Sequence, residues 1–293
     1  MDLWEIRVEV PSGRSEETDL ALLESGVAGW MLMEDALAKR AWIVGIFEGE
    51  EEAVSRWEEL RPSLSESISG TPLPRRLPDS DWKNSYKAHF KAWTFGKLHW
   101  VPVWERATFE LPPRHSVVWL DPGLAFGTGN HETTRLCIER LVEFEAAGGS
   151  REGIRVLDAG CGSGILALSA VRLGYRNVAA FDNDPEAIRV SIENAELNGI
   201  SGKVEFMTAG LPEGLGDGGA GIVLANIQSD ILIRFSGDFV SAVAPGGMLA
   251  MSGILATEIN AVRAAFSAVA PGWPFDSRTL GEWCDACLFR PGP

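Results

Sequence analysis

A glycine-rich turn constrains the fold of this chain more than any other stretch. Residues 156–164 read VLDAGCGSG and run into the apolar segment ILAL. The apolar start predicts a buried strand of a parallel sheet, and the glycines allow a tight turn that a ligand can approach, because they carry no Cβ atom. We expect a helix to begin near Ile165, with free backbone N–H groups in its first turn. This order predicts a doubly wound α/β sheet with a nucleotide-like ligand at its crevice.

The spacing of the glycines and a later acidic residue narrow the class of ligand. The pattern is G-x-G-x-G after Asp158, whereas the dinucleotide fingerprint is G-x-G-x-x-G. A second predicted strand, residues 178–182, ends in Asp182, where an acidic side chain meets ribose hydroxyls in folds of this kind. This combination is typical of the S-adenosyl-L-methionine site of class I methyltransferases. A nicotinamide site and a glycine turn without a ligand are the alternatives.

Composition limits the classes of partner and compartment. The chain has 293 residues, enough for one large domain or two, and a net charge of −15. Such a charge disfavours nonspecific nucleic-acid binding and suits a basic protein partner. The start MDLWE lacks a basic segment followed by an apolar core, and no apolar run is long enough to span a membrane. We therefore expect a cytoplasmic protein that does not bind membranes.

The four cysteines do not indicate a disulfide scaffold. Cys284 and Cys287 form a C-x-x-C pattern within a predicted C-terminal strand. No second pair completes a zinc site, so we interpret this pair as structural rather than metal-binding or redox-active. We expect no metal site.

Residues 1–61 predict a small N-terminal α+β domain of ferredoxin-like type. Apolar and polar residues alternate in a first strand, and the expected order is strand, helix, strand, strand, helix, at residues 3–10, 16–25, 28–33, 41–47 and 50–60. A substrate-recognition module is the natural function for such a domain, and a purely structural lobe is the alternative. Residues 62–80 are rich in proline and serine and predict a linker.

Residues 81–115 form a connecting segment in this interpretation. A helix is expected at residues 81–92, with an aromatic stripe on one face and the lysines on another, at Trp82, Tyr86, His89, Phe90 and Trp93 and at Lys83, Lys87 and Lys91. We favour core packing with solvated lysines. Contact with RNA or with an acidic partner is the alternative.

The stretch DPGLAFGTGNHETT, residues 121–134, is the most distinctive in the chain. It follows an apolar strand at residues 117–120 and precedes a predicted helix at residues 133–144. Its hydroxyls and backbone donors fit a lid over a polar ligand. His131 is a candidate base or ligand contact, and a hydrogen bond that orders the loop is the alternative role.

The rest of the chain continues the alternation of strands and helices. Strands are expected at residues 204–207, 221–226 and 248–251, helices at 184–198, 231–243 and 258–269, and two adjoining strands at about 275–280 and 283–289. Asn226 ends the fourth strand at the carboxyl edge of the sheet, where ligands bind. Residues 116–293 therefore predict a Rossmann-like, seven-stranded doubly wound sheet that ends in an antiparallel hairpin.

These motifs resemble one known family. Residues 121–134 resemble the D-P-G-x-A-F-G-T-G-x-H-x-T-T signature of the ribosomal protein L11 methyltransferase (PrmA) family. Further similarity lies in the glycine motif and in Trp82, His89, Phe90, Asn226-Ile227, Ser252-Gly253-Ile254-Leu255 and Glu282-Trp283. The resemblance implies a small N-terminal recognition domain, a flexible linker and a class I methyltransferase domain. Asn130, Glu132 and Gln228-Ser229 depart from the pattern, on the substrate side of the site.

The resemblance implies a protein methyltransferase that uses S-adenosyl-L-methionine. Its substrate would be amino groups, on lysine side chains or the N-terminal amine, of ribosomal protein L11, a basic large-subunit protein; contact with ribosomal RNA is a further expectation. The alternatives are a lysine methyltransferase for another protein and a noncatalytic ribosome-binding module that retains the fold.

The expected site residues follow from both lines of argument. The family motifs imply that the cofactor contacts Thr134, Gly160, Asp182 and Asn226. The predicted turn and lid add Gly162, Gly164, Phe126, Gly127 and Thr128. Asn226 would also position the amine, and His131 is the other catalytic candidate. The alternative role of Asn226 is a cap at the end of its strand, and that of Thr134 is a hydroxyl at the N-terminus of its helix. Phe126 and aromatic residues of the segment 82–104 are expected to form apolar walls around the amine.

Overall fold

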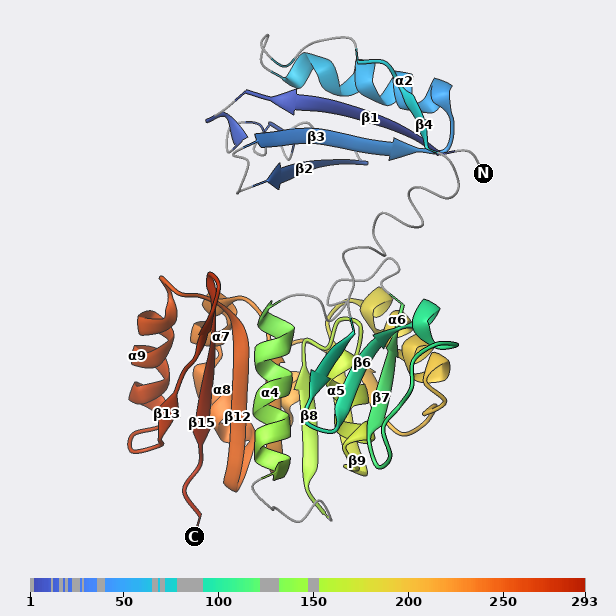
Figure 1. Cartoon of the computed structure of the whole chain (residues 1–293). Coiled ribbons are helices and arrows are strands. Elements are labelled where there is room, and N and C mark those ends of the chain that lie inside the picture. Colours follow the sequence, from blue (N-terminus) through green and yellow to red (C-terminus); the bar gives the residue numbers. More distant parts are fainter. Residues whose placement is uncertain are drawn as a thin grey trace. The chain divides into compact units, whose positions relative to one another are not determined.

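The computed structural model describes most of the chain, in two compact units, Met1–His89 and Phe90–Pro293. The described residues are 3–11, 13–15, 18, 21, 22, 27, 29–35, 40–64, 68, 72–77, 92–121, 132–146 and 153–292. Figure 1 shows the elements of each unit. The two units are described separately.

The first unit is an antiparallel sheet with a helix on one face. Its strands follow the order β2-β3-β1-β4, with β1 at Leu3–Val10, β2 at Trp30–Asp35, β3 at Arg40–Phe47 and β4 at Arg75–Leu77. Helix α2 (Glu50–Leu60) buries Trp57 against Ile6 and Ile43 of the sheet. This is the expected α+β arrangement; the ferredoxin-like assignment stays a prediction, and the helix expected at residues 16–25 lies largely outside the described residues.

Strand β4 corrects the linker prediction. Residues 75–77 were expected within a linker, but they pair with β1, where Leu77 lies opposite Leu3. Arg75 forms an ion pair with Glu5, with a distance of 3.2 Å between Nη2 and Oε2, and Leu77 is buried. The prolines around this strand are typical of a linker, so the sequence pattern does not indicate the pairing with β1.

A three-stranded sheet opens the second unit and corrects the interpretation of residues 81–115. It comprises β5 (Trp93–Phe95), β6 (Leu98–Pro102) and β7 (Ser116–Leu120), with β6 and β7 parallel. Trp100 is fully buried, and its indole N–H donates a hydrogen bond to Ser169 Oγ at 2.8 Å. Residues 92–115 therefore fold with the second unit rather than connecting two domains, and Trp100 belongs to the core rather than to a wall of the site. The helix expected at residues 81–92 lies almost wholly outside the described residues.

The main sheet has the order β10-β9-β8-β11-β12-β15-β13, and β14 also pairs with β15. Its strands are β8 (Arg155–Ala159), β9 (Asn177–Asp182), β10 (Glu205–Thr208), β11 (Ala220–Asn226), β12 (Val243–Leu255), β13 (Phe275–Asp276), β14 (Thr279–Leu280) and β15 (Trp283–Phe289). The first five are parallel and β15 is antiparallel to β12. The sheet has eight strands rather than seven because the strand expected at residues 275–280 is interrupted, where the Arg278 N–H turns to donate to Asp285 Oδ1 at 2.7 Å.

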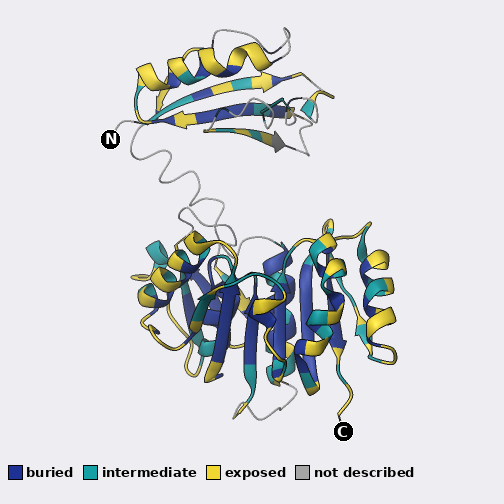
Figure 2. Cartoon of the chain, turned by 180° about the vertical axis from the view of Figure 1, so that it is seen from behind, coloured by how far each residue is buried: buried dark blue, intermediate teal, exposed yellow. Residues whose placement is uncertain are grey.

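Helices cover both faces of this sheet. Helices α4 (Glu132–Ala146), α5 (Ile165–Arg172) and α6 (Pro185–Leu197) pack on one face, and α7 (Ser229–Arg234), α8 (Ser236–Ala242) and α9 (Ile259–Val269) on the other. Neighbouring strand residues, such as Val156 and Leu157, point to opposite cores, so both faces of the central strands are largely apolar. Figure 2 shows buried strands between helices whose outer surfaces are exposed. The helix expected at residues 231–243 is two helices, because the chain leaves helical geometry at Phe235.

The C-x-x-C residues lie in β15 and are buried as free thiols. Burial raises the pKa of Cys287 to about 12, so the thiol stays protonated at neutral pH. Asp285 between them binds Arg140 of α4 through both carboxylate oxygens, at 2.7 and 2.8 Å. Within the described ranges, no group of three His, Cys, Asp or Glu residues is placed to hold a metal ion, and no helix there is long and apolar enough to cross a bilayer.

Candidate cofactor site

The glycine turn joins β8 to α5 in left-handed backbone geometry. The φ angles of Gly160, Gly162 and Gly164 are 69°, 54° and 76°. A Cβ atom on Gly160 would lie 2.6 Å from Ile227 Cγ2, in the loop that follows β11. Only glycine satisfies both the backbone angle and this close approach.

Four N–H groups of the turn are bonded within the protein, and in the first turn of α5, where free donors were expected, the Ala167 N–H donates to Asp158 Oδ2 at 3.0 Å. Gly160 and Cys161 both donate to the Phe181 carbonyl, at 2.9 and 3.0 Å, and Gly164 donates to the Cys161 carbonyl at 2.8 Å. Gly162 donates to Asp182 Oδ2 at 2.9 Å. The donors of the turn therefore hold the turn itself in shape.

Helix α6 fixes the other side of the turn. Ser191 Oγ donates to the Gly162 carbonyl and Asn194 Nδ2 donates to the Ser163 carbonyl, each at 2.9 Å. These bonds satisfy both carbonyls without a ligand. The turn is thus preorganised, which reduces the entropic cost of binding.

Asp182 ends β9 and is held by two backbone N–H groups. Its Oδ2 accepts from Gly162, and its Oδ1 accepts from the Asp184 N–H at 3.0 Å. Asp184 in turn caps α6 by accepting from the Glu186 N–H at 2.9 Å. Because each carboxylate oxygen accepts more than one hydrogen bond, Asp182 retains capacity for a pair of hydroxyls.

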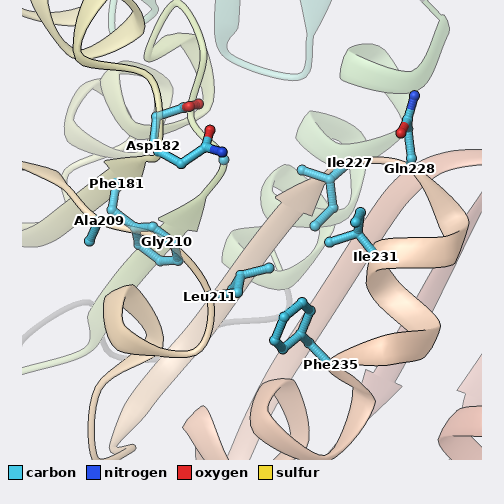
Figure 3. Close-up of a pocket in the computed structure, with 11 residues that line it drawn as sticks. Phe181, Asp182, Ala209, Gly210, Leu211, Ile227, Gln228, Ile231 and Phe235 are labelled. Atoms are coloured by element: carbon cyan, nitrogen blue, oxygen red, sulfur yellow. The ribbon is translucent and has the colours of Figure 1, made fainter.

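A cavity of about 470 Å³ lies at the carboxyl ends of the parallel strands (Figure 3). It is lined by Gly160, Phe181, Asp182, Asn183, Ala209, Gly210, Leu211, Ile227, Gln228, Ile231 and Phe235. In Figure 3, Asp182 and Ala209 lie on one side, and Ile227, Gln228 and Ile231 lie on the other. The volume falls in the range of small-molecule sites, which is about 300–1,000 Å³.

Sequence reasoning found only part of this wall. It predicted Gly160 and Asp182 as cofactor contacts and Gln228 as a departure on the substrate side, and all three line the cavity. Ala209 and Ile227 immediately follow β10 and β11, so the rule that ligands bind at carboxyl strand ends would have found them. Leu211 and Phe235 reach the cavity through the path of their loops, and no local pattern marks them.

Thr134 and Asn226 contact each other although 92 residues separate them, and neither of them lines the cavity. Asn226 Nδ2 donates to Thr134 Oγ1 at 3.1 Å, which joins the end of β11 to the first turn of α4. Thr134 is buried, and Ile227, the next residue after Asn226, lines the cavity. With its Nδ2 engaged, Asn226 has the amide oxygen left to accept a hydrogen bond from a ligand.

The other predicted site residues divide into two groups. Gly162 and Gly164 do not line the cavity; Gly164 caps α5 and packs against Ser191. Phe126, Gly127, Thr128 and His131 lie outside the described residues, as do Asn130 and the other residues of the segment 122–131. Their roles stay predictions.

Asp158 is a buried carboxyl group beneath the turn. Its Oδ2 accepts from the Ala167 N–H at 3.0 Å, whereas its Oδ1 has no hydrogen-bond partner in the described structure. Burial raises the pKa of Asp158 to about 7, with a smaller effect from the negative charge of Asp182, although the bond from Ala167 opposes the shift. Charging this group thus costs folding free energy.

Asp158→Asn is expected to flatten the pH dependence of stability. A carboxyl with a raised pKa binds its proton more tightly when folded, so the free energy of unfolding falls as pH rises from about 4 to 7. The full contribution is on the order of 4 kcal/mol. Urea unfolding at pH 5 and pH 8 should show a larger loss for the wild type than for the variant. The exposed control Asp217→Asn should follow the wild type; equal losses in all three proteins would refute the assignment.

The sheet order, the glycine turn and Asp182 at the cavity together define a class I S-adenosyl-L-methionine-dependent methyltransferase. The profile of the family described as "Ribosomal protein L11 methyltransferase (PrmA)" matches residues 3–289. The chain belongs to this family, and the expected fold class of its second unit is confirmed.

Individual relatives agree with the family match. A "Ribosomal protein L11 methyltransferase" of Pelobacter propionicus is 41% identical over 254 residues, which cover 83% of this chain and 80% of the relative. One of Pseudomonas putida strain W619 is 35% identical over 287 residues, covering 92% and 93%. The crystal structure of a ribosomal protein L11 methylase from Lactobacillus delbrueckii subsp. bulgaricus superposes with a TM-score of 0.59 at 29% identity, covering 69% of this chain and 100% of that chain.

S-adenosyl-L-methionine is the methyl donor of this family, and the site fits it. The cavity has the required size, Asp182 offers carboxylate oxygens at the end of β9, and a side chain at Gly160 would intrude on Ile227 in the cavity wall. When bound, the cofactor supplies an electrophilic methyl group. The protein has to hold it, exclude water and orient the acceptor.

Thr134→Val is expected to lower the rate of methyl transfer about tenfold, because the loss of one hydrogen bond to Asn226 costs ~1 kcal/mol or more. Valine keeps the shape of threonine but cannot accept the bond. Thr134→Ser keeps the hydroxyl and should retain most of the rate. Single-turnover assays with saturating cofactor would compare the three proteins, and a valine variant as fast as the wild type would show that the contact does not position Asn226.

Proposed function

We propose that this chain transfers methyl groups from S-adenosyl-L-methionine to amino groups of ribosomal protein L11. Lysine side chains are the main acceptors in this proposal, and the N-terminal amine is the second. The names of the relatives support the substrate. The observation that carries the chemistry is Asn226, an amide held by Thr134 next to the cavity wall. An amide oxygen there can accept a hydrogen bond from an amine and direct its lone pair.

The site has to present the amine in its neutral form. A free lysine titrates near ~10.4, so deprotonation at pH 7 costs about 4–5 kcal/mol. Apolar surroundings lower this cost because they disfavour the ammonium ion. Ile227, Ile231 and Phe235 provide an apolar wall on one side of the cavity. The proton can leave to water before the acceptor is fully enclosed, so the described residues need not include a general base.

We further propose that the first unit recognises the protein substrate. Its sheet has a face away from α2 on which Met31, Met33 and Ile46 are exposed. On the same face, the guanidinium groups of Arg7 and Arg40 lie 4.3 and 5.0 Å from the ring of Trp42. Exposed apolar patches mark interaction sites, and methionine adapts to the shape of a partner.

Contact with ribosomal RNA and location in the cytoplasm complete the proposal. The lysines at 83, 87 and 91 support RNA contact. This support comes from the sequence alone, because these lysines lie outside the described residues. The proposed substrate is a ribosomal protein, and this supports the cytoplasm as the compartment.

Peptide mapping of L11 by mass spectrometry tests the proposed acceptor. L11 incubated with the enzyme and cofactor should gain methyl groups on lysine-containing peptides or at its N-terminus. Methyl groups on other residue types, with none on amines, would refute amine chemistry. In a parallel incubation with other purified ribosomal proteins, methyl groups on one of them but not on L11 would support the alternative of a different substrate.

Trp42→Ala is expected to raise the KM for L11 about tenfold, because removing a large aromatic contact costs ~1–2 kcal/mol or more at an interface. The dissociation constant of the cofactor should stay unchanged, as the substitution is in the first unit. The control Leu73→Ala removes another exposed apolar side chain outside the sheet. A KM equal to that of the control would argue that this face does not bind substrate.

A further inference from the structure

A second cavity, of about 660 Å³, lies at the opposite edge of the main sheet from the cofactor site. It is lined by Ser116, Val171, Arg172, Gly174, Tyr175, Arg176, Ile200 and Lys203. Arg176 immediately precedes β9, whereas Asp182 ends that strand at the cofactor cavity. A strand of this length spans roughly 20 Å, so the two cavities are separate sites.

Cations without counter-ions gather at this second cavity. Arg172, Arg176 and Lys203 line it, and none of them forms an ion pair with any carboxylate in the described part of the chain. Glu205 starts β10 two residues after Lys203 but does not pair with it in the described structure. By contrast, the exposed Arg189 pairs with both Glu186 and Glu193. An uncompensated basic cluster is unexpected in a chain with a net charge of −15.

Arg172 is held in place by the loop behind it. Its Nη2 donates to the Asn198 carbonyl, and its Nε is buried without a hydrogen-bond partner in the described structure. Asn198 is itself fixed to β7, with its Oδ1 accepting from the Trp119 N–H at 2.7 Å and its Nδ2 donating to the Trp119 carbonyl at 3.0 Å. Desolvation, together with the nearby Arg106, lowers the pKa of Arg172. A bound anion would offset both effects.

We propose that this cavity binds a phosphate group, through Arg172, Arg176 and Lys203. Guanidinium groups match phosphate oxygens in a bidentate geometry, and lysine adds a mobile point charge. Three cations around one cavity suit a phosphate, which carries one or two negative charges, better than a carboxylate, which carries only one. The phosphate comes either from an RNA backbone or from a small ligand such as a free nucleotide. This site is distinct from the cofactor cavity and does not depend on the substrate proposed above.

Two probes test the proposal with the full-length protein. Fluorescence anisotropy with a labelled ten-nucleotide single-stranded RNA measures binding to a backbone, and calorimetry with inorganic pyrophosphate measures binding of a small ligand. The double variant Arg176→Gln/Lys203→Gln should weaken binding of whichever probe the wild type binds, at least about tenfold at low salt. Each phosphate contact that is lost also loses the favourable release of a counter-ion. For RNA, the slope of log K against log salt should fall by about 1.4, or ~0.7 per contact.

The double variant Arg56→Gln/Arg189→Gln matches the charge change at exposed arginines that already pair with glutamates. It should bind both probes as the wild type does, and cofactor affinity should be equal in all proteins. Tighter binding of RNA than of pyrophosphate identifies a nucleic acid as the source, and the reverse identifies a small phosphate ligand. The proposal is overturned if the wild type binds neither probe, if both double variants behave alike, or if a glutamate-rich peptide binds as tightly as the phosphates.

Discussion

Gly160→Ala is expected to weaken binding of S-adenosyl-L-methionine by about 10- to 100-fold, since overpacking a tight contact costs ~1–3 kcal/mol. The new Cβ atom would lie 2.6 Å from Ile227 Cγ2. Ile227 lines the cofactor cavity, so displacing its side chain would change the wall against which the cofactor is expected to pack. Calorimetric titration of the cofactor measures the effect directly.

Gly199→Ala is the matched control for backbone strain. Its φ angle of 65° is close to the 69° of Gly160, but no atom lies within 4 Å of the Cβ position. Both variants should lose similar stability from left-handed backbone, on the order of 1 kcal/mol. Only Gly160→Ala should lose cofactor affinity. Equal cofactor affinities in the two variants would show that the glycine turn is not part of the binding site.

Asp182→Ala is expected to weaken cofactor binding about 100-fold or more, because a hydrogen bond to a charged group is worth ~1.5–3 kcal/mol and two are lost. The same substitution releases the Gly162 N–H from its acceptor and loosens the turn. The prediction concerns the dissociation constant measured by calorimetry, and methyl transfer at low cofactor concentration should fall in parallel.

Asp184→Ala removes an equal charge two residues away and tests whether charge alone explains the result. Asp184 caps α6 and does not line the cavity, so its loss should cost stability of about 1 kcal/mol with little change in cofactor affinity. If Asp182→Ala bound the cofactor as tightly as Asp184→Ala, the assignment of Asp182 to the ribose hydroxyls would be wrong.

The parallel core was predictable from the sequence because its signals are local. The apolar run before the glycines predicted β8, and Asp184-Pro185 with Gly199 predicted the two ends of α6. The short strands were not predictable in this way. Strand β4 depends on pairing with β1, and β5 depends on pairing with β6, so the order of residues within each segment carries little information.

The candidate site shows the same division between local and distant information. Gly160 and Asp182 follow from motif spacing along two adjacent strands. The contact of Thr134 with Asn226 was not predicted, since α4 and β11 meet through the tertiary fold; the family motifs implied only that each residue contacts the cofactor. Leu211 and Phe235 line the cavity because of loop paths that depend on the whole domain, which no periodicity reports.

Transfer of radiolabelled methyl from S-adenosyl-L-methionine into a mixture of purified ribosomal proteins tests the central claim most directly. The account predicts label in the L11 band with the wild type, and little label with Asp182→Ala at the same cofactor concentration. Absence of label from L11, in a preparation that binds the cofactor normally by calorimetry, would contradict the proposed function.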